Sequence, residues 1–222
     1  MARAVVVGAS RGLGRALIEG LRSDGDEVLG ISRRRPDGFD VSEWIEADLT
    51  DPVTAANSID QELVGGVDTL ICNVGIWEGD AFTTDYAFAE QSDMEMLEMI
   101  NANITATILL LKRLIPRMIG RPRPRIILTG STSGLPRSGR PEVAFGASKF
   151  AINGIADALR GLPEGQTRCD CPSSRISQYR RRTRRAPRRR CRQGEDLWSR
   201  YMTLWIRCAR SRVCRLRRQC GK

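Results

Sequence analysis

The sequence contains no histidine, and its first 168 residues contain a single cysteine, Cys72. The other six cysteines fall at irregular spacings between Cys169 and Cys220, so they do not form the paired ligand sets of a zinc module and we predict no metal site. No apolar run approaches the roughly 18 residues that a membrane span needs. Ala4–Val7 is too short for the core of a signal peptide, and we therefore expect a cytoplasmic protein that does not enter a membrane.

Charge divides the chain of 222 residues into two unlike parts. Residues 168–222 hold 19 of the 36 Lys and Arg but three of the 26 Asp and Glu, whereas residues 1–167 hold 17 basic and 23 acidic side chains. The basic part shows no apolar periodicity over 179–192, which is typical of a solvated or disordered segment. We predict one domain over residues 1–165, followed by a basic, Arg- and Cys-rich tail over residues 166–222.

Short apolar runs alternate with helical stretches along the first part of the chain. The predicted strands are Ala4–Val7, Val28–Ser32, Asp68–Cys72 and Arg125–Thr129, and the predicted helices include Arg15–Arg22, Met94–Met118 and Phe145–Arg160. Strands that alternate with helices at this spacing indicate an α/β protein with a Rossmann-type, doubly wound parallel sheet. The length suits a single domain with a sizeable core.

A glycine-rich turn follows the first strand directly. It consists of Gly8, Gly12 and Gly14, with Ser10, Arg11 and Leu13 between them. Such a turn lets the backbone approach a pyrophosphate, and the free N–H groups at the start of the following helix hold the anion. Glycines also occur in ordinary tight turns, but a strand before the motif and a helix after it favour a dinucleotide site.

This glycine spacing resembles that of the short-chain dehydrogenase/reductase superfamily, and later segments resemble the same family in order, from Arg3 to Leu162. The resemblance implies that Asp48 and Leu49 contact adenine and that Asn73, Val74 and Gly75 support the sheet beside the cofactor. It further implies that Asn103 is the family's helix asparagine, that Ser131 is the catalytic serine, and that Lys149 is the catalytic lysine, which also contacts the cofactor.

The end of the second predicted strand bears on the choice of cofactor. Members of the family that prefer NAD usually carry an acidic residue there, whereas this chain has Ser32 followed by Arg33, Arg34 and Arg35. An acid would repel a 2′-phosphate, and arginine binds one with charge-assisted hydrogen bonds. Arg11 adds a cation in the glycine turn. The alternative is a solvated basic loop, but the pattern favours NADP over NAD.

The resemblance also implies a tyrosine four residues before the catalytic lysine, and this position holds Phe145. In the family that tyrosine exchanges a proton, and the lysine lowers the phenol's pKa from about 10. Tyr86, Tyr179 and Tyr201 do not have the spacing of a replacement, although water or a substrate group could take over the role. We therefore predict an NADP-dependent oxidoreductase for a carbonyl or hydroxyl of an unknown small molecule, weak or inactive as written. The alternative is a non-catalytic NADP-binding sensor or scaffold.

The family's later features, a sixth strand with a Pro-Gly turn and a final strand, are not visible after Leu159, so we expect the last strands to be missing or disordered. The basic tail has two further interpretations beside the zinc module. Its arginines could bind nucleic acid, with Trp198 and Trp205 stacking on bases, or the tail could be translated out of frame. Residues 171–176, read one base later, are compatible with Val-Leu-His-Pro-Gly-Tyr, which is a strand ending in the Pro-Gly turn.

A frame disruption also explains the excess of Arg, Cys and Trp, and we favour it over nucleic-acid binding. The sequence of the coding DNA tests this interpretation. The predicted helices Met94–Met118 and Phe145–Arg160 correspond to those that commonly pair subunits in the family. The resemblance therefore implies a homodimer or homotetramer.

Overall fold

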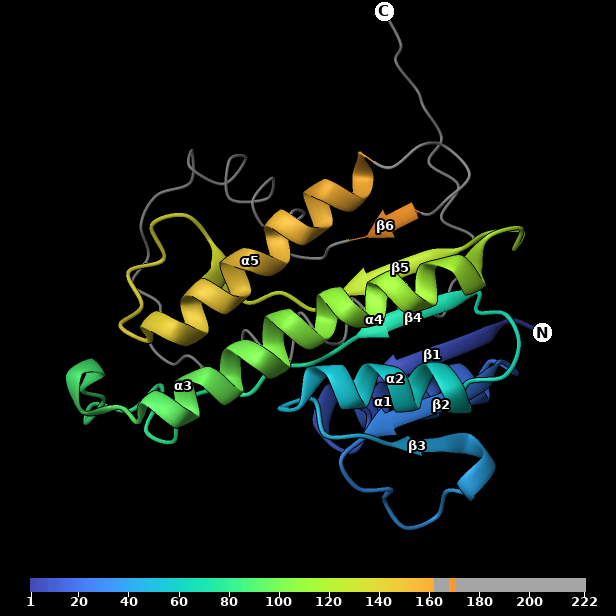
Figure 1. The fold of residues 1–222 in the computed structure, drawn as a ribbon, viewed down its shortest axis with the longest axis horizontal. Helices are drawn as coiled ribbons and strands as arrows, with labels where there is room; N and C mark the ends of the chain where they lie inside the picture. Colours follow the sequence, from blue (N-terminus) through green and yellow to red (C-terminus); the bar gives the residue numbers. More distant parts are fainter. Residues whose placement is uncertain (162–167, 171–222) are drawn as a thin grey trace, which may run out of the picture. The chain divides into compact units, whose positions relative to one another are not determined.

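The computed structural model describes residues 1–161 and 168–170, which form a parallel sheet with helices on both faces (Figure 1). The strands are β1 (Arg3–Val7), β2 (Glu27–Ser32), β3 (Trp44–Glu46), β4 (Thr69–Cys72), β5 (Arg125–Leu128) and β6 (Arg168–Asp170). They lie in the order β3-β2-β1-β4-β5-β6, and each neighbouring pair is parallel. The prediction of a Rossmann-type, doubly wound sheet is confirmed.

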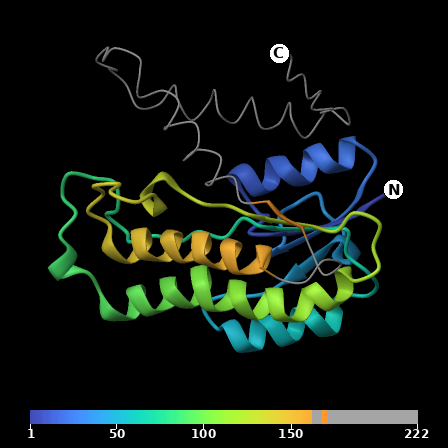
Figure 2. The ribbon, with the colours of Figure 1, turned by 90° about the horizontal axis from the view of Figure 1, so that it is seen from above.

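Helices connect the strands and cover both faces of the sheet. They are α1 (Gly12–Ser23), α2 (Pro52–Glu62), α3 (Asp93–Ile100), α4 (Ala106–Leu114) and α5 (Val143–Arg160), with short turns η1 (Val41–Glu43), η2 (Phe88–Glu90), η3 (Asn101–Thr105), η4 (Ile115–Met118) and η5 (Thr132–Gly134). Seen from above, α1 lies on one face, while α2, α4 and α5 lie on the other (Figure 2). This arrangement brings the start of α1 and the start of α5 to the end of the sheet where the strands finish (Figure 1).

The core lies mainly between the sheet and the face formed by α2, α4 and α5. Because side chains alternate along a strand, Val5 and Val7 of β1 point to this face, together with Leu70 of β4. They pack in one cluster with Ile59 of α2 and Leu110 of α4. Each fully buried side chain of this size contributes about 1.5–3 kcal/mol, so the β-branched runs in the sequence account for both the strands and the core.

The run Asp93–Met118 combines α3, η3, α4 and η4, and it is long and apolar enough to cross a membrane by length and composition alone. The sequence had suggested that no stretch came close to that limit. Ala106, Leu110 and Leu114 are nevertheless buried against the sheet, as in a core helix of a globular domain, which passes the same test. The helical path is also interrupted, because η3 is a single turn of π-helix.

Helix and strand boundaries agree with prediction to within three residues where an element had been expected, except that the predicted helix Met94–Met118 is divided into α3, η3, α4 and η4. The strand β3 and the helix α2 had not been delimited from the sequence. The strand β6, which pairs with β5 through Ile126 and Cys169, corrects the expectation that every strand after Leu159 is missing or disordered. The rest of the predicted basic tail lies outside the described residues, and so does the segment proposed to be read out of frame. The boundary between residues 165 and 166 stays a prediction.

Candidate cofactor and proton-transfer site

The glycine turn between β1 and α1 has the shape that a close backbone approach requires. Gly8 has φ +78°, and a Cβ atom at this position would lie 2.5 Å from the carbonyl oxygen of Asn73. The N–H of Gly8 donates to the oxygen of Ile31 at 2.9 Å, and the Asn73 amide donates to the oxygen of Gly8 at 3.3 Å. The turn is therefore fixed to both neighbouring strands, and only glycine fits at residue 8.

The first turn of α1 is open to an anion. Arg11 occupies the N-cap position without a side-chain hydrogen bond to the helix, and no acidic residue lies in the first turn. Ser10 and Leu13 are half-buried beside the exposed Gly12, while Gly14 is buried. The free backbone N–H groups and the positive end of the helix dipole suit a pyrophosphate at this position.

Three arginines surround this turn without an ionic partner among the described residues: Arg11, Arg33 and Arg34 are all exposed. Arg35 differs, because its N–H donates to Glu46 at 2.7 Å and its guanidinium donates to the oxygen of Phe39. The loop after β2 therefore uses one arginine to hold its own shape and leaves the two before it available.

Ser32 and Trp44 hold the loop after β2, residues 33–40, which we call the arginine loop. The Ser32 hydroxyl donates to the oxygen of Arg34 at 2.8 Å and accepts the indole N–H of Trp44 at 3.2 Å. Trp44 lies so close to the sheet that a Cβ atom on Gly30 would meet its ring at 2.3 Å. The hydroxyl of Ser32 is thus engaged in fixing the arginine loop, and its predicted contact with the cofactor stays a prediction.

The predicted adenine pair lies at the end of β3. The Asp48 carboxylate accepts hydrogen bonds from the N–H and the hydroxyl of Thr50, at 3.0 and 2.9 Å, so it shapes its own turn. Leu49 is half-buried against the core. A cavity of about 210 Å³ opens beside Asp48 toward the start of α2, lined by Glu46, Ala47, Asp48, Asp51, Thr54, Ala55 and Ser58.

Lys149 forms the centre of the second half of the site. Its ammonium group donates to the oxygens of Val74, at 2.6 Å, and Thr129, at 3.3 Å. Gly75 passes so close that a Cβ atom there would lie 3.0 Å from the Lys149 Nζ atom. Only 4% of Lys149 is exposed, and this burial lowers the pKa of its ammonium from 10.5 to about 8. The structure therefore joins the predicted segment after β4 to the predicted catalytic lysine.

Asn103 fixes the chain after β4 to the helices. Its side chain accepts the N–H of Ile76 at 2.9 Å and donates to the oxygen of the same residue at 2.8 Å. It also donates to the hydroxyl of Ser148 at 3.0 Å, and 1% of the residue is exposed. Asn103 lies in the π-helical turn η3, a distortion that often occurs at functional sites. The turn places the amide between two segments that are far apart in sequence.

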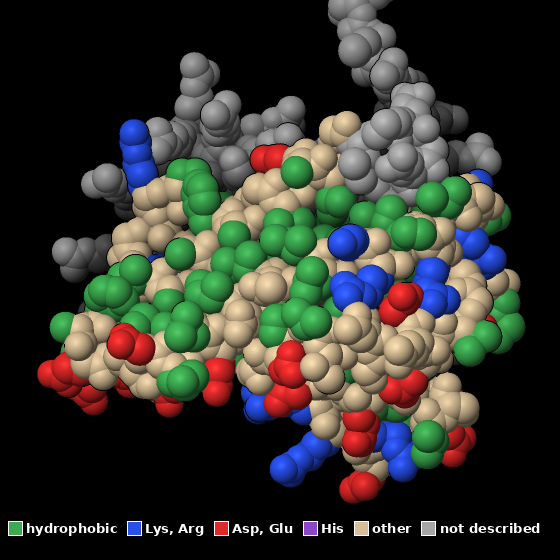
Figure 3. Space-filling model, in the orientation of Figure 1, with side chains coloured by type: hydrophobic (Ala, Val, Ile, Leu, Met, Phe, Trp, Pro, Cys, Tyr) green, Lys and Arg blue, Asp and Glu red, His purple; other side chains and the backbone are tan. Residues whose placement is uncertain are grey.

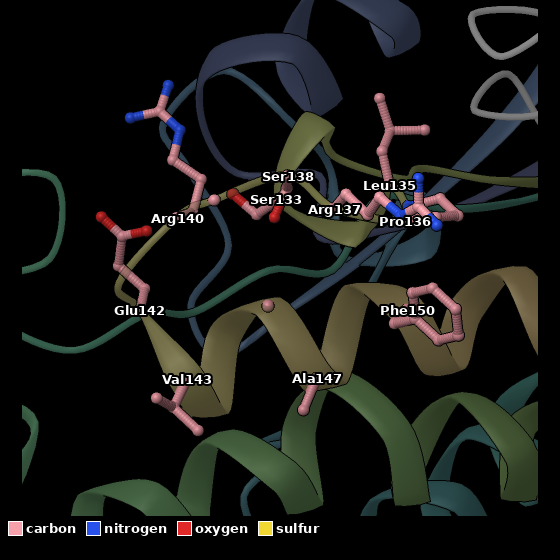
Figure 4. A pocket seen from close by; sticks show the side chains of 12 residues that line it. Ser133, Leu135, Pro136, Arg137, Ser138, Arg140, Glu142, Val143, Ala147 and Phe150 are labelled. Carbon is pink, nitrogen blue, oxygen red and sulfur yellow. The ribbon is translucent and has the colours of Figure 1, made fainter.

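Ser131 precedes η5, where its hydroxyl accepts the N–H of Ser133 at 3.2 Å. Near it, a cavity of about 370 Å³ lies between the segment after β5 and α5 (Figure 4). It is lined by Ser133, Leu135, Pro136, Arg137, Ser138, Gly139, Arg140, Glu142, Val143, Gly146, Ala147 and Phe150. Neither Phe145 nor Lys149 lines this cavity, so it lies beside the lysine site.

Phe145 occupies the position of the proton-exchanging tyrosine and is 5% exposed. The Lys149 ammonium lies 5.8 Å from the centre of its ring. Trp77 and Phe82 pack edge-on against the same ring, with centroids 6.2 and 5.4 Å from it. The ring therefore fills the expected space and supplies no exchangeable proton.

Sequence reasoning missed two carboxylates and a phenol at the start of α5. The Glu78 carboxylate accepts the N–H of Phe145 at 3.4 Å and the hydroxyl of Tyr86 at 3.3 Å, and that hydroxyl accepts the N–H of Val143 at 3.2 Å. Burial raises the pKa of the Tyr86 phenol. Glu142 accepts the N–H of Phe82 at 3.0 Å. Sequence spacing carried no signal for this arrangement, because three of the four contacts join residues about 60 positions apart.

Comparison with known families places the chain in the short chain dehydrogenase family. The profile of the short chain dehydrogenase family matches residues 2–164. The 3-oxoacyl-(acyl-carrier-protein) reductase FabG of Escherichia coli is 28% identical over 165 residues, which cover 70% of this chain and 65% of the relative. The 3-ketodihydrosphingosine reductase of Bacteroides thetaiotaomicron is 30% identical over 158 residues, which cover 70% of this chain and 56% of the relative. The match thus spans less than two thirds of either relative.

Solved structures show the same fold. The ligand-free aldohexose dehydrogenase of Thermoplasma acidophilum superposes with a TM-score of 0.62 at 26% identity, covering 77% of this chain and 64% of that one. A short chain dehydrogenase of Shigella flexneri, solved in complex with NADP, superposes with a TM-score of 0.61 at 23% identity. It covers 77% of this chain and 75% of the other.

Proposed function

Since this chain belongs to the short-chain dehydrogenase family, we propose that it binds NADP through the glycine turn and the arginine loop. We further propose that it acts on a carbonyl or hydroxyl of a small molecule, and that with Phe145 in its sequence it has little or no turnover. The observation that carries the cofactor assignment is the set of three exposed arginines, Arg11, Arg33 and Arg34, left without ionic partners in the described residues.

Charge supports NADP rather than NAD. A 2′-phosphate near the end of β2 would meet guanidinium groups that form charge-assisted, bidentate hydrogen bonds. Arg33 and Arg34 reach this position because Arg35, Ser32 and Trp44 hold the loop. When bound, the dinucleotide supplies a hydride acceptor or donor. The residues of this chain bind its phosphates and orient its rings.

Titration of the full chain with NADP and with NAD, followed by calorimetry, tests the proposal. We expect NADP to bind at least tenfold more tightly, because each lost charge-assisted bond costs about 1.5–3 kcal/mol. Arg33→Ala should weaken NADP binding about tenfold or more and leave NAD binding nearly unchanged. Arg140→Ala, another exposed arginine, is the matched control and should change neither. Equal affinities of the wild type for both cofactors would contradict the assignment.

Two observations at the second half of the site support weak or absent catalysis. Phe145 has no exchangeable side-chain proton, and the Tyr86 hydroxyl is hydrogen-bonded to Val143 and Glu78. Ser131, Lys149 and Asn103 are present, and in the family the serine orients the substrate oxygen, but general acid–base catalysis typically contributes 10²–10⁴-fold and here lacks its usual group. This supports a second candidate of the same fold, a cofactor-binding sensor or scaffold without turnover.

We also propose that the chain pairs with a second copy through α3, α4 and α5. Hydrophobic side chains gather on this face in the view of Figure 3. Met94, Leu97, Ile108, Val143 and Phe150 are each about half exposed or more, with exposed fractions of 64, 59, 47, 50 and 53%. Contiguous apolar surface of this kind marks an association site. Sedimentation of the full chain should show a dimer or tetramer, and Ile108→Glu should shift it toward the monomer.

A further inference from the structure

Three aromatic rings meet beside Lys149, and we call them the ring cluster: Trp77, Phe82 and Phe145. Their centroids are 5.9 Å apart for Trp77 and Phe82, 6.2 Å for Trp77 and Phe145, and 5.4 Å for Phe82 and Phe145. Each pair is arranged edge to face, which is the favourable geometry for aromatic side chains. The cluster is therefore a packed unit built from two segments of the chain.

The rings differ in how much of their surface is open. Phe145 is 5% exposed and packs against Met99 and Ala144, so it forms the base of the cluster. Trp77 and Phe82 stand on it and remain 51 and 48% exposed. Two large apolar rings packed on Phe145 thus keep half their surface available for contact. Continuity with Lys149, 5.8 Å from the Phe145 ring, places this surface at the proposed reaction site.

Phe82 has a strained backbone conformation. Its φ of +69° is a left-handed conformation that side chains other than glycine rarely adopt and that lowers stability. The Phe82 N–H donates to the carboxylate of Glu142 at 3.0 Å, and Glu142 is 2% exposed. A buried carboxylate thus holds the strained residue in the orientation that brings its ring onto Phe145 and Trp77.

Phe145 is held in the same manner. Its N–H donates to Glu78, which is also 2% exposed, at 3.4 Å. Both glutamates keep their second carboxylate oxygen buried without a hydrogen-bond partner in the described residues. Burying such groups is costly, and strain that persists in a fold tends to mark a functional site. The two phenylalanines are therefore fixed elements, unlike scattered apolar residues on a surface.

We propose that the exposed rings of Trp77 and Phe82 bind a flat, neutral aromatic compound that carries a carbonyl or hydroxyl group. The aromatic part of the ligand packs against these rings, which favour another π-system in offset or edge-on geometry. Charges of both signs lie close by, since the Lys149 ammonium is 5.8 Å from the Phe145 ring and Glu142 and Glu78 accept the N–H groups of the two phenylalanines, so neither an anion nor a cation is favoured. This assignment rests on the proposed function and gives that site its substrate class.

Binding of 2-acetylnaphthalene, compared with the same ketone on a fully saturated ring system, tests the assignment. Calorimetry on the full chain loaded with NADP should show about tenfold tighter binding of the aromatic ketone. Trp77→Ala should weaken this binding about three- to tenfold, whereas Trp77→Phe should keep most of it. Phe88→Ala is the matched control, because Phe88 is 47% exposed in the same connection and belongs to no described ring pair.

Phe82→Gly separates a binding role from a structural one. Glycine accepts the left-handed conformation, so we expect the melting temperature to fall by at most a few degrees while the preference for the aromatic ketone is lost. A preference that survives in both Phe82→Gly and Trp77→Ala would overturn the assignment, as would equal binding of both ketones by the wild type. The same ketone titration on the cofactor-free protein separates the test of the substrate class from the test of NADP binding. Failure to bind NADP refutes the proposed function, and the ketone preference still decides the substrate class.

Discussion

The two halves of the site differ in what they leave open. Around the glycine turn, backbone N–H groups at the start of α1 and the guanidinium groups of Arg33 and Arg34 lack partners in the described residues. Around Lys149, by contrast, the ammonium is held by two carbonyl oxygens, and the rings of Trp77 and Phe82 pack on Phe145. Binding of a cofactor and transfer of a proton are thus assigned to separate parts of the fold, and one part can persist when the other has changed.

The largest test of this contrast is Phe145→Tyr. If the second half lacks only a proton donor, the added hydroxyl should raise the rate of carbonyl reduction with NADPH by about 10²–10⁴-fold. NADP affinity should stay within about twofold, because the glycine turn and arginines are untouched. Absorbance of NADPH at saturating cofactor, with a panel of aromatic and aliphatic ketones, measures the gain.

Phe150→Tyr is the control for that change. Phe150 is on the same helix, 53% exposed, and lines the cavity beside the site instead of facing Lys149. It should produce no gain in turnover. A Phe145→Tyr protein that folds, binds NADP and remains inactive would show that the second half lacks more than a hydroxyl.

Gly8→Ala should break the first half alone. The new Cβ would lie 2.5 Å from the oxygen of Asn73, and the alanine would have to adopt a φ of +78°. We therefore expect the free energy of unfolding to fall by about 2–4 kcal/mol and NADP binding to be lost. Gly12→Ala is the matched variant, because its φ is +54° but nothing lies within 4 Å of its added Cβ. Chemical denaturation should show a cost of about 1 kcal/mol for Gly12→Ala. Equal costs for the two variants would mean that the close approach to Asn73 is unimportant.

The effect of Lys149→Met on stability depends on pH. The folded lysine has a pKa of about 8, below the ordinary 10.5, so between these values the unfolded chain binds more protons. Wild-type stability should therefore rise with pH across this window, by about 2–3 kcal/mol relative to the Met variant. Denaturant midpoints measured from pH 7 to 11 give the difference between the two proteins. Parallel curves would show that burial of the ammonium costs the fold nothing.

Local signals in the sequence were sufficient for most of the fold. The β-branched run Ala4–Val7 and the glycine turn that follows it can be recognised from adjacent residues in the sequence, and the structure places this strand and this turn as expected. Lys149 could be assigned by resemblance, but its contact with Val74 is a product of the sheet order. The strand β3 is three residues long and too short for a periodic pattern.

The ring cluster and its two glutamates lay beyond sequence reasoning for a physical reason. Trp77 and Phe82 are separated from Phe145 by more than 60 residues, and they meet because β4 and β5 are neighbours in the sheet. A glutamate in a loop ordinarily suggests solvent, so the burial of Glu78 and Glu142 could not be inferred from residue type. Tertiary packing decided both features.

Trp44 and Gly30 make the two ends of the arginine loop dependent on one another. The indole ring occupies the space that a side chain on residue 30 would need, at 2.3 Å from the position of its Cβ. A side chain at residue 30 fits only where residue 44 is smaller than tryptophan, so we expect the two positions to vary together among close relatives. A redesign of cofactor preference can therefore exchange Arg33 and Arg34, provided that this glycine and this tryptophan are inherited as a pair and Arg35 keeps its bonds to Glu46 and Phe39.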